Sequence, residues 1–299
     1  MDKSLVVAFA LAAPLLTAQA LAQTPQQFLW CEGNGDVSPE QQITACTVLI
    51  DSGLSSTVEL AVAFDNRGLA YAKEGQYDRA ISDYDEAVGL NPNDSTALTN
   101  RGLAYVSKGQ YDRAIADFGD AIKLNPNYAA AYDGRGLAYA SLGQYDRAIA
   151  DYDEAIRLNP NSPAAFYDRG NAYAKTGRYD RAIASYDEAI GLHPTVAALN
   201  NRGLAYASEG HYNRAITDYD EAIKLDPNSA FVFNNRGLAY AREDHLKQAL
   251  ADYDEAIRLD PNYAVAFYNR GLLRERKGDT KGGKADIARA RQLDPAIGK

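Results

Sequence analysis

The hydrophobic and polar positions of the chain alternate in a pattern that recurs along most of its length. Apolar residues fall at helical spacing in two consecutive stretches, for example Val62–Lys73 and Tyr77–Leu90. Glu74-Gly75-Gln76 forms a polar turn between them, and Asn91-Pro92-Asn93 ends the second stretch. The pattern therefore predicts two amphipathic helices joined as a hairpin.

The same hairpin is repeated with a nearly constant period. An Arg-Gly dipeptide marks each copy, and the step is 34 residues except between Arg169 and Arg202, where it is 33. Such a period is typical of a solenoid, in which each repeat packs only on its neighbours. The marker arginines are Arg67, Arg101, Arg135, Arg169, Arg202, Arg236 and Arg270.

Small and aromatic residues occupy fixed places within each copy. In the first copy they are Gly68, Tyr71, Ala80, Tyr84 and Ala87, followed by a proline. This spacing resembles the tetratricopeptide-repeat (TPR) signature. The resemblance covers residues 61–297 and implies an all-α fold, a right-handed α-solenoid superhelix of seven helical hairpins. Framed on the signature, the repeats are 61–94, 95–128, 129–162, 163–195, 196–229, 230–263 and 264–297.

The first 22 residues have the features of an export signal. Lys3 precedes an apolar run from Leu5 to Leu16, and the small-residue pattern Ala20-Leu21-Ala22 follows. The run is shorter than the roughly 20 residues of a bilayer span, which favours a cleaved secretory signal peptide over the alternative of an uncleaved anchor. We therefore expect a periplasmic or secreted protein without a membrane span in the mature chain.

Residues 23–60 contain both cysteines of the chain, Cys31 and Cys46. In an oxidising compartment this pair predicts a disulfide. Ser38-Pro39-Glu40-Gln41 resembles a capping box, after which Ile43, Cys46 and Ile50 would line one face of a helix. We expect this helix to cap the first repeat, and the disulfide to hold the preceding extended segment against it.

Net charge narrows the range of partners. The chain carries a net charge of −9, which disfavours binding to nucleic acid. Residues 264–297 differ, with eight Lys or Arg against four Asp or Glu. This last repeat is interpreted as a polar C-terminal cap, or alternatively as a docking patch for an acidic partner.

Candidate binding residues follow from the resemblance, which implies that the first helices line a concave groove that holds peptides. The position before the marker arginine is asparagine in five of seven repeats. An amide side chain can both donate to and accept from a peptide backbone. The row resembles the asparagine ladder of some peptide-binding TPR superhelices, although a general preference for asparagine at this position is the alternative. The candidates are Asn66, Asn100, Asn201, Asn235 and Asn269, with Tyr167, Asn171, Asn200, Asn234 and Tyr268 beside them.

An arginine and an aspartate also recur at a fixed separation, and we interpret them as a structural pair. An aspartate stands 16 residues after six of the marker arginines, as Asp83 does after Arg67, whereas Ser185 takes this place in the fourth repeat. Because the fork-shaped arginine head can satisfy a buried carboxylate, these residues are predicted to pair within the helix packing.

No constellation of catalytic groups is apparent in the sequence. The acidic string Asp83-Tyr84-Asp85-Glu86 recurs, but helix positions two apart point to different sides. His193, His211 and His245 occupy turns without further ligands beside them, so neither a metal site nor a cofactor is predicted. The sequence therefore predicts a non-enzymatic scaffold for a protein or peptide partner and leaves the oligomeric state open. The alternative is a structural component of a cell-envelope or polymer-export assembly, acting through convex or terminal surfaces.

Overall fold

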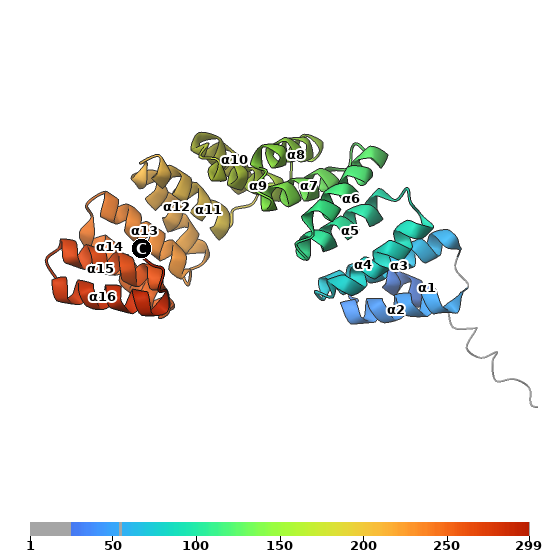
Figure 1. Cartoon of the computed structure of the whole chain (residues 1–299), viewed down its shortest axis with the longest axis horizontal. Helices are drawn as coiled ribbons and strands as arrows, with labels where there is room; N and C mark the ends of the chain where they lie inside the picture. The colour runs from blue at the N-terminus through green and yellow to red at the C-terminus, as the bar shows by residue number, and fades with distance from the viewer. Residues whose placement is uncertain (1–24, 54–55, 299) are drawn as a thin grey trace, which may run out of the picture. The chain divides into compact units, whose positions relative to one another are not determined.

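The computed structural model describes residues 25–53 and 56–298, and within them the regular elements are α-helices (Figure 1). Helices α3 to α16 form seven consecutive hairpins, so the α-solenoid predicted from the repeat is confirmed. The predicted signal peptide, residues 1–22, lies outside the described residues. Within the described part of the chain, no helix combines the length and the apolar character needed to cross a membrane.

The helices belong to two compact units that meet in sequence after Pro126. The first unit holds the N-terminal helices and repeats 1 and 2. Its helices are α1 (Pro25–Cys31), α2 (Pro39–Ser52), α3 (Thr57–Lys73), α4 (Tyr77–Leu90), α5 (Ser95–Ser107) and α6 (Tyr111–Leu124).

The second unit holds repeats 3 to 7. Its first three hairpins are α7 (Ala129–Ser141) with α8 (Tyr145–Leu158), α9 (Pro163–Lys175) with α10 (Tyr179–Leu192), and α11 (Val196–Ser208) with α12 (Tyr212–Leu225). The last two are α13 (Ala230–Arg242) with α14 (Leu246–Leu259), and α15 (Ala264–Arg276) with α16 (Thr280–Leu293).

A glycine against an aromatic ring joins the two helices of each of the first six hairpins. A Cβ atom built on Gly203 would lie 2.6 Å from Cε1 of Tyr219, a distance that packed atoms do not reach. Repeat 7 lacks the aromatic residue. Its two backbones approach each other instead, because a Cβ on Gly283 would lie 2.7 Å from the carbonyl oxygen of Gly271. Gly283 stands where the other six repeats have alanine, and repeat 7 is thus still a closely packed hairpin.

The turn between the helices of a hairpin needs a left-handed residue. Glycine supplies it in six repeats, as Gly75 does with φ 73°. In repeat 6 Asp244 takes this conformation with φ 61°, and its carboxylate accepts a hydrogen bond from Arg276 at 2.6 Å.

The predicted arginine–aspartate pairs are present in six repeats. Arg101 donates from Nε and Nη2 to the two carboxylate oxygens of Asp117, each at 2.8 Å, and the hydrogen bond raises the pKa of Arg101. Its Nη1 reaches back to Asp85 of the preceding repeat at 2.8 Å. Arg202, Arg236 and Arg270 make the same two links, so in four repeats the arginine ties the second helix of its own hairpin to the second helix of the hairpin before it.

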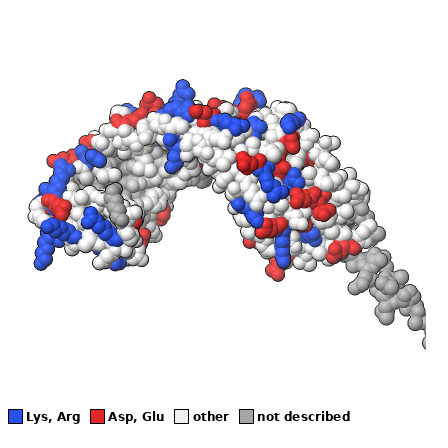
Figure 2. All heavy atoms as spheres, viewed as in Figure 1, with Lys and Arg blue, Asp and Glu red and all other residues white. Residues whose placement is uncertain are grey.

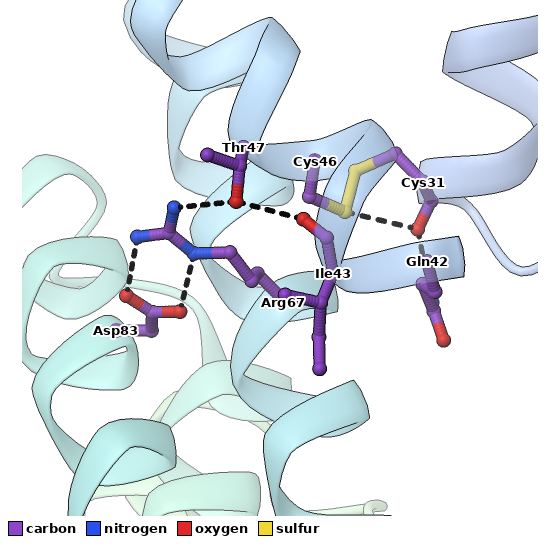
Figure 3. The surroundings of a disulfide bond; sticks show 7 residues. All are labelled: Cys31, Gln42, Ile43, Cys46, Thr47, Arg67 and Asp83. Carbon is purple, nitrogen blue, oxygen red and sulfur yellow. Dashed lines mark hydrogen bonds and ion pairs between the residues drawn. A yellow bond between two sulfur atoms is a disulfide. The ribbon is translucent and has the colours of Figure 1, made fainter. Parts of the chain in front are cut away.

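The N-terminal segment differs in one respect from the prediction. Residues 25–31 form the short helix α1, where an extended segment was expected. The disulfide between Cys31 and Cys46 joins α1 to α2, and Gln42 Nε2 donates to the carbonyl oxygen of Cys31 at 3.0 Å (Figure 3). Because tertiary contacts hold α1, its formation needs no strong helix signal in the sequence.

Helix α2 caps repeat 1, as the fold prediction expected. Ser38 and Gln41 form the predicted capping box. The side of α2 that is buried is centred on Ala45, Cys46 and Leu49, so Ile43 and Ile50 lie at its margins. Thr47 Oγ1 accepts a hydrogen bond from Arg67 at 3.1 Å, which links α2 to the first arginine–aspartate pair (Figure 3). The next helix, α3, begins at Thr57 and not at Val62, because Ser56 and Glu59 form a second capping box.

Candidate functional site

The residues before the marker arginines lie on the first helix of each hairpin. In the second unit the first helices of successive repeats contact one another, from α7 to α9, α11, α13 and α15 (Figure 1). Side chains on these helices can therefore form a row that continues from repeat to repeat.

The asparagines of repeats 5 to 7 form one chain of hydrogen bonds. Asn269 Nδ2 donates to Asn234 Oδ1 at 2.9 Å, and Asn234 Nδ2 donates to Asn235 Oδ1 at 3.3 Å. Asn235 Nδ2 continues to Asn200 Oδ1 at 2.9 Å, and Asn200 Nδ2 continues to Asn201 Oδ1 at 3.1 Å. Repeats 5 and 6 each contribute two asparagines to the row, one before the marker arginine and one a residue earlier, whereas repeat 7 contributes Asn269 alone.

In repeat 4 the chain of hydrogen bonds ends on a tyrosine and on an asparagine two residues after the marker arginine. Asn201 Nδ2 donates to Tyr167 Oη at 3.1 Å and to Asn171 Oδ1 at 3.0 Å. Asn171 also accepts from the hydroxyl of Tyr186 at 2.8 Å. The hydrogen bonds therefore join seven of the eight predicted groove residues of the second unit. Tyr268, the eighth, lies against Gly298.

Burial separates the two kinds of asparagine. Asn200 and Asn234 are 6% and 3% exposed, so nearly all of their surface lies within the helix packing. Asn201, Asn235 and Asn269 are partly exposed. The buried residues hold the partly exposed ones in position, because each accepts from the amide of the next repeat.

The hydrogen bonds leave the partly exposed amides with unequal capacity. A carboxamide has two N–H donors and two acceptor lone pairs. Asn201 uses both N–H groups, whereas Asn235 and Asn269 each use one. Asn235 and Asn269 therefore keep a donor and an acceptor, which is what pairing with a peptide group requires.

The first unit contains a separate and shorter pair. Asn100 Nδ2 donates to the carboxylate of Asp65 at 3.1 Å, and Asn66 makes no side-chain hydrogen bond within the described residues. Burial raises the pKa of Asp65 to about 6, although the hydrogen bond from Asn100 acts in the opposite direction. The asparagine row predicted from sequence thus consists of one set in each unit.

A row of exposed leucines accompanies the asparagines, and these leucines are not among the residues predicted from the sequence. Each leucine follows the Arg-Gly dipeptide, and Leu204, Leu238 and Leu272 are 42%, 40% and 45% exposed. The recurrence of Arg-Gly-Leu was the signal that could have revealed the row. Exposed apolar side chains at the same place in successive repeats are typical of an interaction surface.

Between these leucines lie three hollows that adjoin one another. The first has Asn201 and Leu204 in its wall, the second has Leu204, Asn235 and Leu238, and the third has Leu238, Asn269 and Leu272. Their volumes are about 470, 220 and 180 Å³ in that order. Adjoining hollows share a leucine, so they form a continuous surface along repeats 4 to 7, which we call the leucine–asparagine face.

Two carboxylates interrupt the amide pattern in repeats 3 and 4. Asp168 stands before the marker arginine of repeat 4, and Asp133 takes the position that Asp65 holds in repeat 1. Burial and the negative charge of Asp133 raise the pKa of Asp168 to about 6. Burial also raises the pKa of Asp133, whose Oδ1 is buried without a hydrogen-bond partner in the described structure.

No group of three His, Cys, Asp or Glu side chains suited to a metal ion occurs within residues 25–53 and 56–298. Lysine and arginine gather at the end of the chain formed by α15 and α16, where several blue side chains are visible in Figure 2.

Comparisons with solved structures identify the fold. A tetratricopeptide repeat protein from Parabacteroides merdae is 19% identical, with 79% of this chain and 94% of that chain covered and a TM-score of 0.61. MamA is 28% identical, with 55% and 96% covered and a TM-score of 0.51. YrrB, described as a TPR protein with an unusual peptide-binding site, is 24% identical, with 60% and 93% covered and a TM-score of 0.51.

Family models identify the same repeat from the amino-acid sequence, whereas the search of curated proteins found no match. The model described as TPR repeat matches residues 68–109, 102–143, 136–177 and 245–278. A second, described as tetratricopeptide repeat, matches residues 167–230. With most of its hairpins matched by these models and by the fold of solved TPR proteins, the chain belongs to the tetratricopeptide-repeat family and is a scaffold for protein–protein interaction.

Proposed function

We propose that the chain is a non-enzymatic, exported scaffold that binds an extended segment of a partner protein on the leucine–asparagine face. The observation that carries this proposal is the coincidence of exposed leucines and incompletely bonded amides in adjoining hollows. The leucines supply apolar area, and Asn235 and Asn269 supply a donor and an acceptor for the backbone of the segment.

The spacing of the repeats indicates how such a segment would fit. Packed helices lie about 8 to 10 Å apart. An extended chain rises about 3.3 Å per residue, so one repeat corresponds to about three residues. A polyproline II segment has three residues per turn and no internal hydrogen bonds. It would therefore present the same side and a free backbone to each successive hollow.

Export is proposed from the sequence together with the disulfide. The Cys31–Cys46 bridge joins α1 to α2, and disulfides persist in oxidising compartments. The predicted signal peptide leads to the same location, periplasmic or secreted. Intact mass of the protein from its native host, with and without reductant, measures both the removal of residues 1–22 and the bridge.

Selection of peptides on the purified mature chain tests the binding proposal. We expect selected peptides to bind the wild type and to lose about tenfold or more in affinity for the double variant Asn235→Ala/Asn269→Ala, since each lost amide removes a hydrogen bond of about 1 kcal/mol. Asn213→Ala, on the exposed side of α12, is the matched control and should bind normally. Equal affinity of the double variant and the wild type would remove this face from the proposal.

A further inference from the structure

The last helix of the chain carries charge where the other second helices carry apolar packing residues. In repeats 1 to 6 the second helix has an aliphatic residue at two positions seven residues apart, as Ile216 and Ile223 in repeat 5. Ile216 is 9% exposed and belongs to a core cluster that includes two residues of the following repeat. Repeat 7 has Lys284 and Arg291 at these two positions, and both are exposed.

This side of α16 has nothing packed against it. Within residues 25–53 and 56–298, α16 packs on α15 alone. Lys281, Lys284, Ala288 and Arg291 follow one another at helical spacing along the same side, and all four are exposed. The three basic side chains form no ion pair with the described part of the chain. We call these four residues the basic face.

The N-terminal end of the chain has the opposite charge. Residues 23–60 contain five Asp or Glu and no Lys or Arg. Of the described helices, α1 packs only on α2 and α3, so the outer side of α1 and α2 is also uncovered. Glu32, Asp36 and Glu40 are exposed there and form no ion pair with the described residues.

An apolar hollow lies beside these acidic residues, between α1 and α2. It has a volume of about 280 Å³, and its wall includes Trp30, Glu40, Thr44 and Val48. Trp30 and Val48 are each 38% exposed. The outer side of a terminal repeat that serves only as a cap is polar, whereas exposed apolar side chains grouped in this way are typical of an interaction surface. We call these four residues, with Glu32, the acidic face.

We propose that the basic face of one copy of the chain docks on the acidic face of a second copy, so that the protein associates head to tail. The lysine and arginine side chains of one copy pair with Glu32 and Glu40 of the other, and the small side chain of Ala288 allows α16 to approach Trp30 closely. A cation near the indole ring is attracted to it as well. Because two different faces meet, each added copy leaves one face free for the next.

This association does not compete with the binding of a partner segment. None of the residues of the basic and acidic faces lines the hollows of the leucine–asparagine face. A contact confined to α16 of one copy and to α1 and α2 of another is small, so we expect weak association that depends on charge. Several linked copies would present several leucine–asparagine faces to one partner and raise its overall affinity.

Sedimentation velocity of the mature chain at rising protein concentration tests the proposal. At low ionic strength the weight-average mass should rise above that of one chain as the concentration increases. In about 0.5 M salt, where the screening length is about 4 Å, it should return to the mass of one chain.

Two double variants assign the contact to the two faces. Lys284→Gln/Arg291→Gln removes charge from the basic face, and Thr44→Lys/Val48→Lys places repelling charge on the acidic face. Each should weaken self-association at least tenfold. A mixture of the two should form a 1:1 dimer and nothing larger, since the first variant keeps an intact acidic face and the second an intact basic face.

The variant Lys224→Gln/Lys247→Gln is the matched control. It removes the same charge as Lys284→Gln/Arg291→Gln, but from exposed positions on α12 and α14, and it should associate like the wild type. All six substitutions are at exposed positions, so thermal unfolding followed by circular dichroism should show the stability of the wild type.

Three outcomes would overturn the proposal. They are a wild type that stays monomeric at low salt, self-association that either double variant retains in full, and a mixture of the two variants that forms no dimer. None of these outcomes bears on the proposed function, because the peptide measurements on Asn235→Ala/Asn269→Ala use a different surface of the chain.

Discussion

Replacing Asp168 by asparagine should stabilise the protein above pH 6 and leave it unchanged in acid. The pKa of this carboxyl rises from 3.8 to about 6 in the fold, first through burial and then through the charge of Asp133, while a hydrogen bond with Asn171 opposes the rise. A carboxyl whose pKa is raised by folding stabilises the fold when protonated. This contribution is fully present below pH 3.8 and is lost as the pH rises through about 6.

The size of the effect follows from the shift. A change of about two pKa units corresponds to about 3 kcal/mol as an upper limit. Because Asp168 is only partly buried, solvent screening reduces this, and we expect about 1 to 2 kcal/mol at pH 8. The variant amide can also donate to Asp133 Oδ1, which now lacks a partner, as Asn100 donates to Asp65 in repeat 1.

Urea unfolding of both proteins, followed by circular dichroism at pH 8 and at pH 3.5, measures the difference. The surface variant Asp146→Asn is the control, since its exposed pair with Arg178 contributes at most about 1 kcal/mol. A stability gain that is the same at both pH values, or a loss at pH 8, would refute the explanation by the raised pKa.

Three further changes test the packing. Gly203→Ala should cost about 1 to 3 kcal/mol in unfolding experiments, because the new methyl meets the Tyr219 ring. Gly119→Ala, with open space around it in α6, should instead stabilise by up to about 1 kcal/mol. If both variants lose stability equally, the glycine–aromatic contact is not the cause. Asp218→Asn should lower stability by about 2 to 4 kcal/mol at pH 7, since it leaves the buried side of Arg202 unpaired, and a loss below 0.5 kcal/mol in the same assay would contradict that role. Cys46→Ser should release α1 to limited proteolysis with a loss of about 3 kcal/mol, the value for a loop of about 15 residues, and α1 as protected as in the wild type would show that the bridge is dispensable.

The sequence by itself determined the hairpins, their number and the arginine–aspartate pairs. These depend on spacing within one repeat or between adjacent repeats, and seven copies make the spacing unmistakable. The disulfide could also be predicted, because two cysteines leave one possible pairing within the chain. The helix α1 could not, since seven residues hold a helix only through the contacts with α2 that surround the bridge.

The tertiary structure alone decided which candidate residues keep free hydrogen-bonding groups at the surface. All five asparagines of the row look equivalent in sequence, yet their remaining hydrogen-bonding capacity differs because each depends on the side chain that the neighbouring repeat presents. The hydroxyl of Tyr186 finds its partner within its own hairpin, where Asn171 accepts from it, whereas Leu204 stands at that place beside the unpartnered hydroxyl of Tyr219. A periodic pattern specifies what each repeat has in common, whereas a binding site is made by the points at which neighbouring repeats differ.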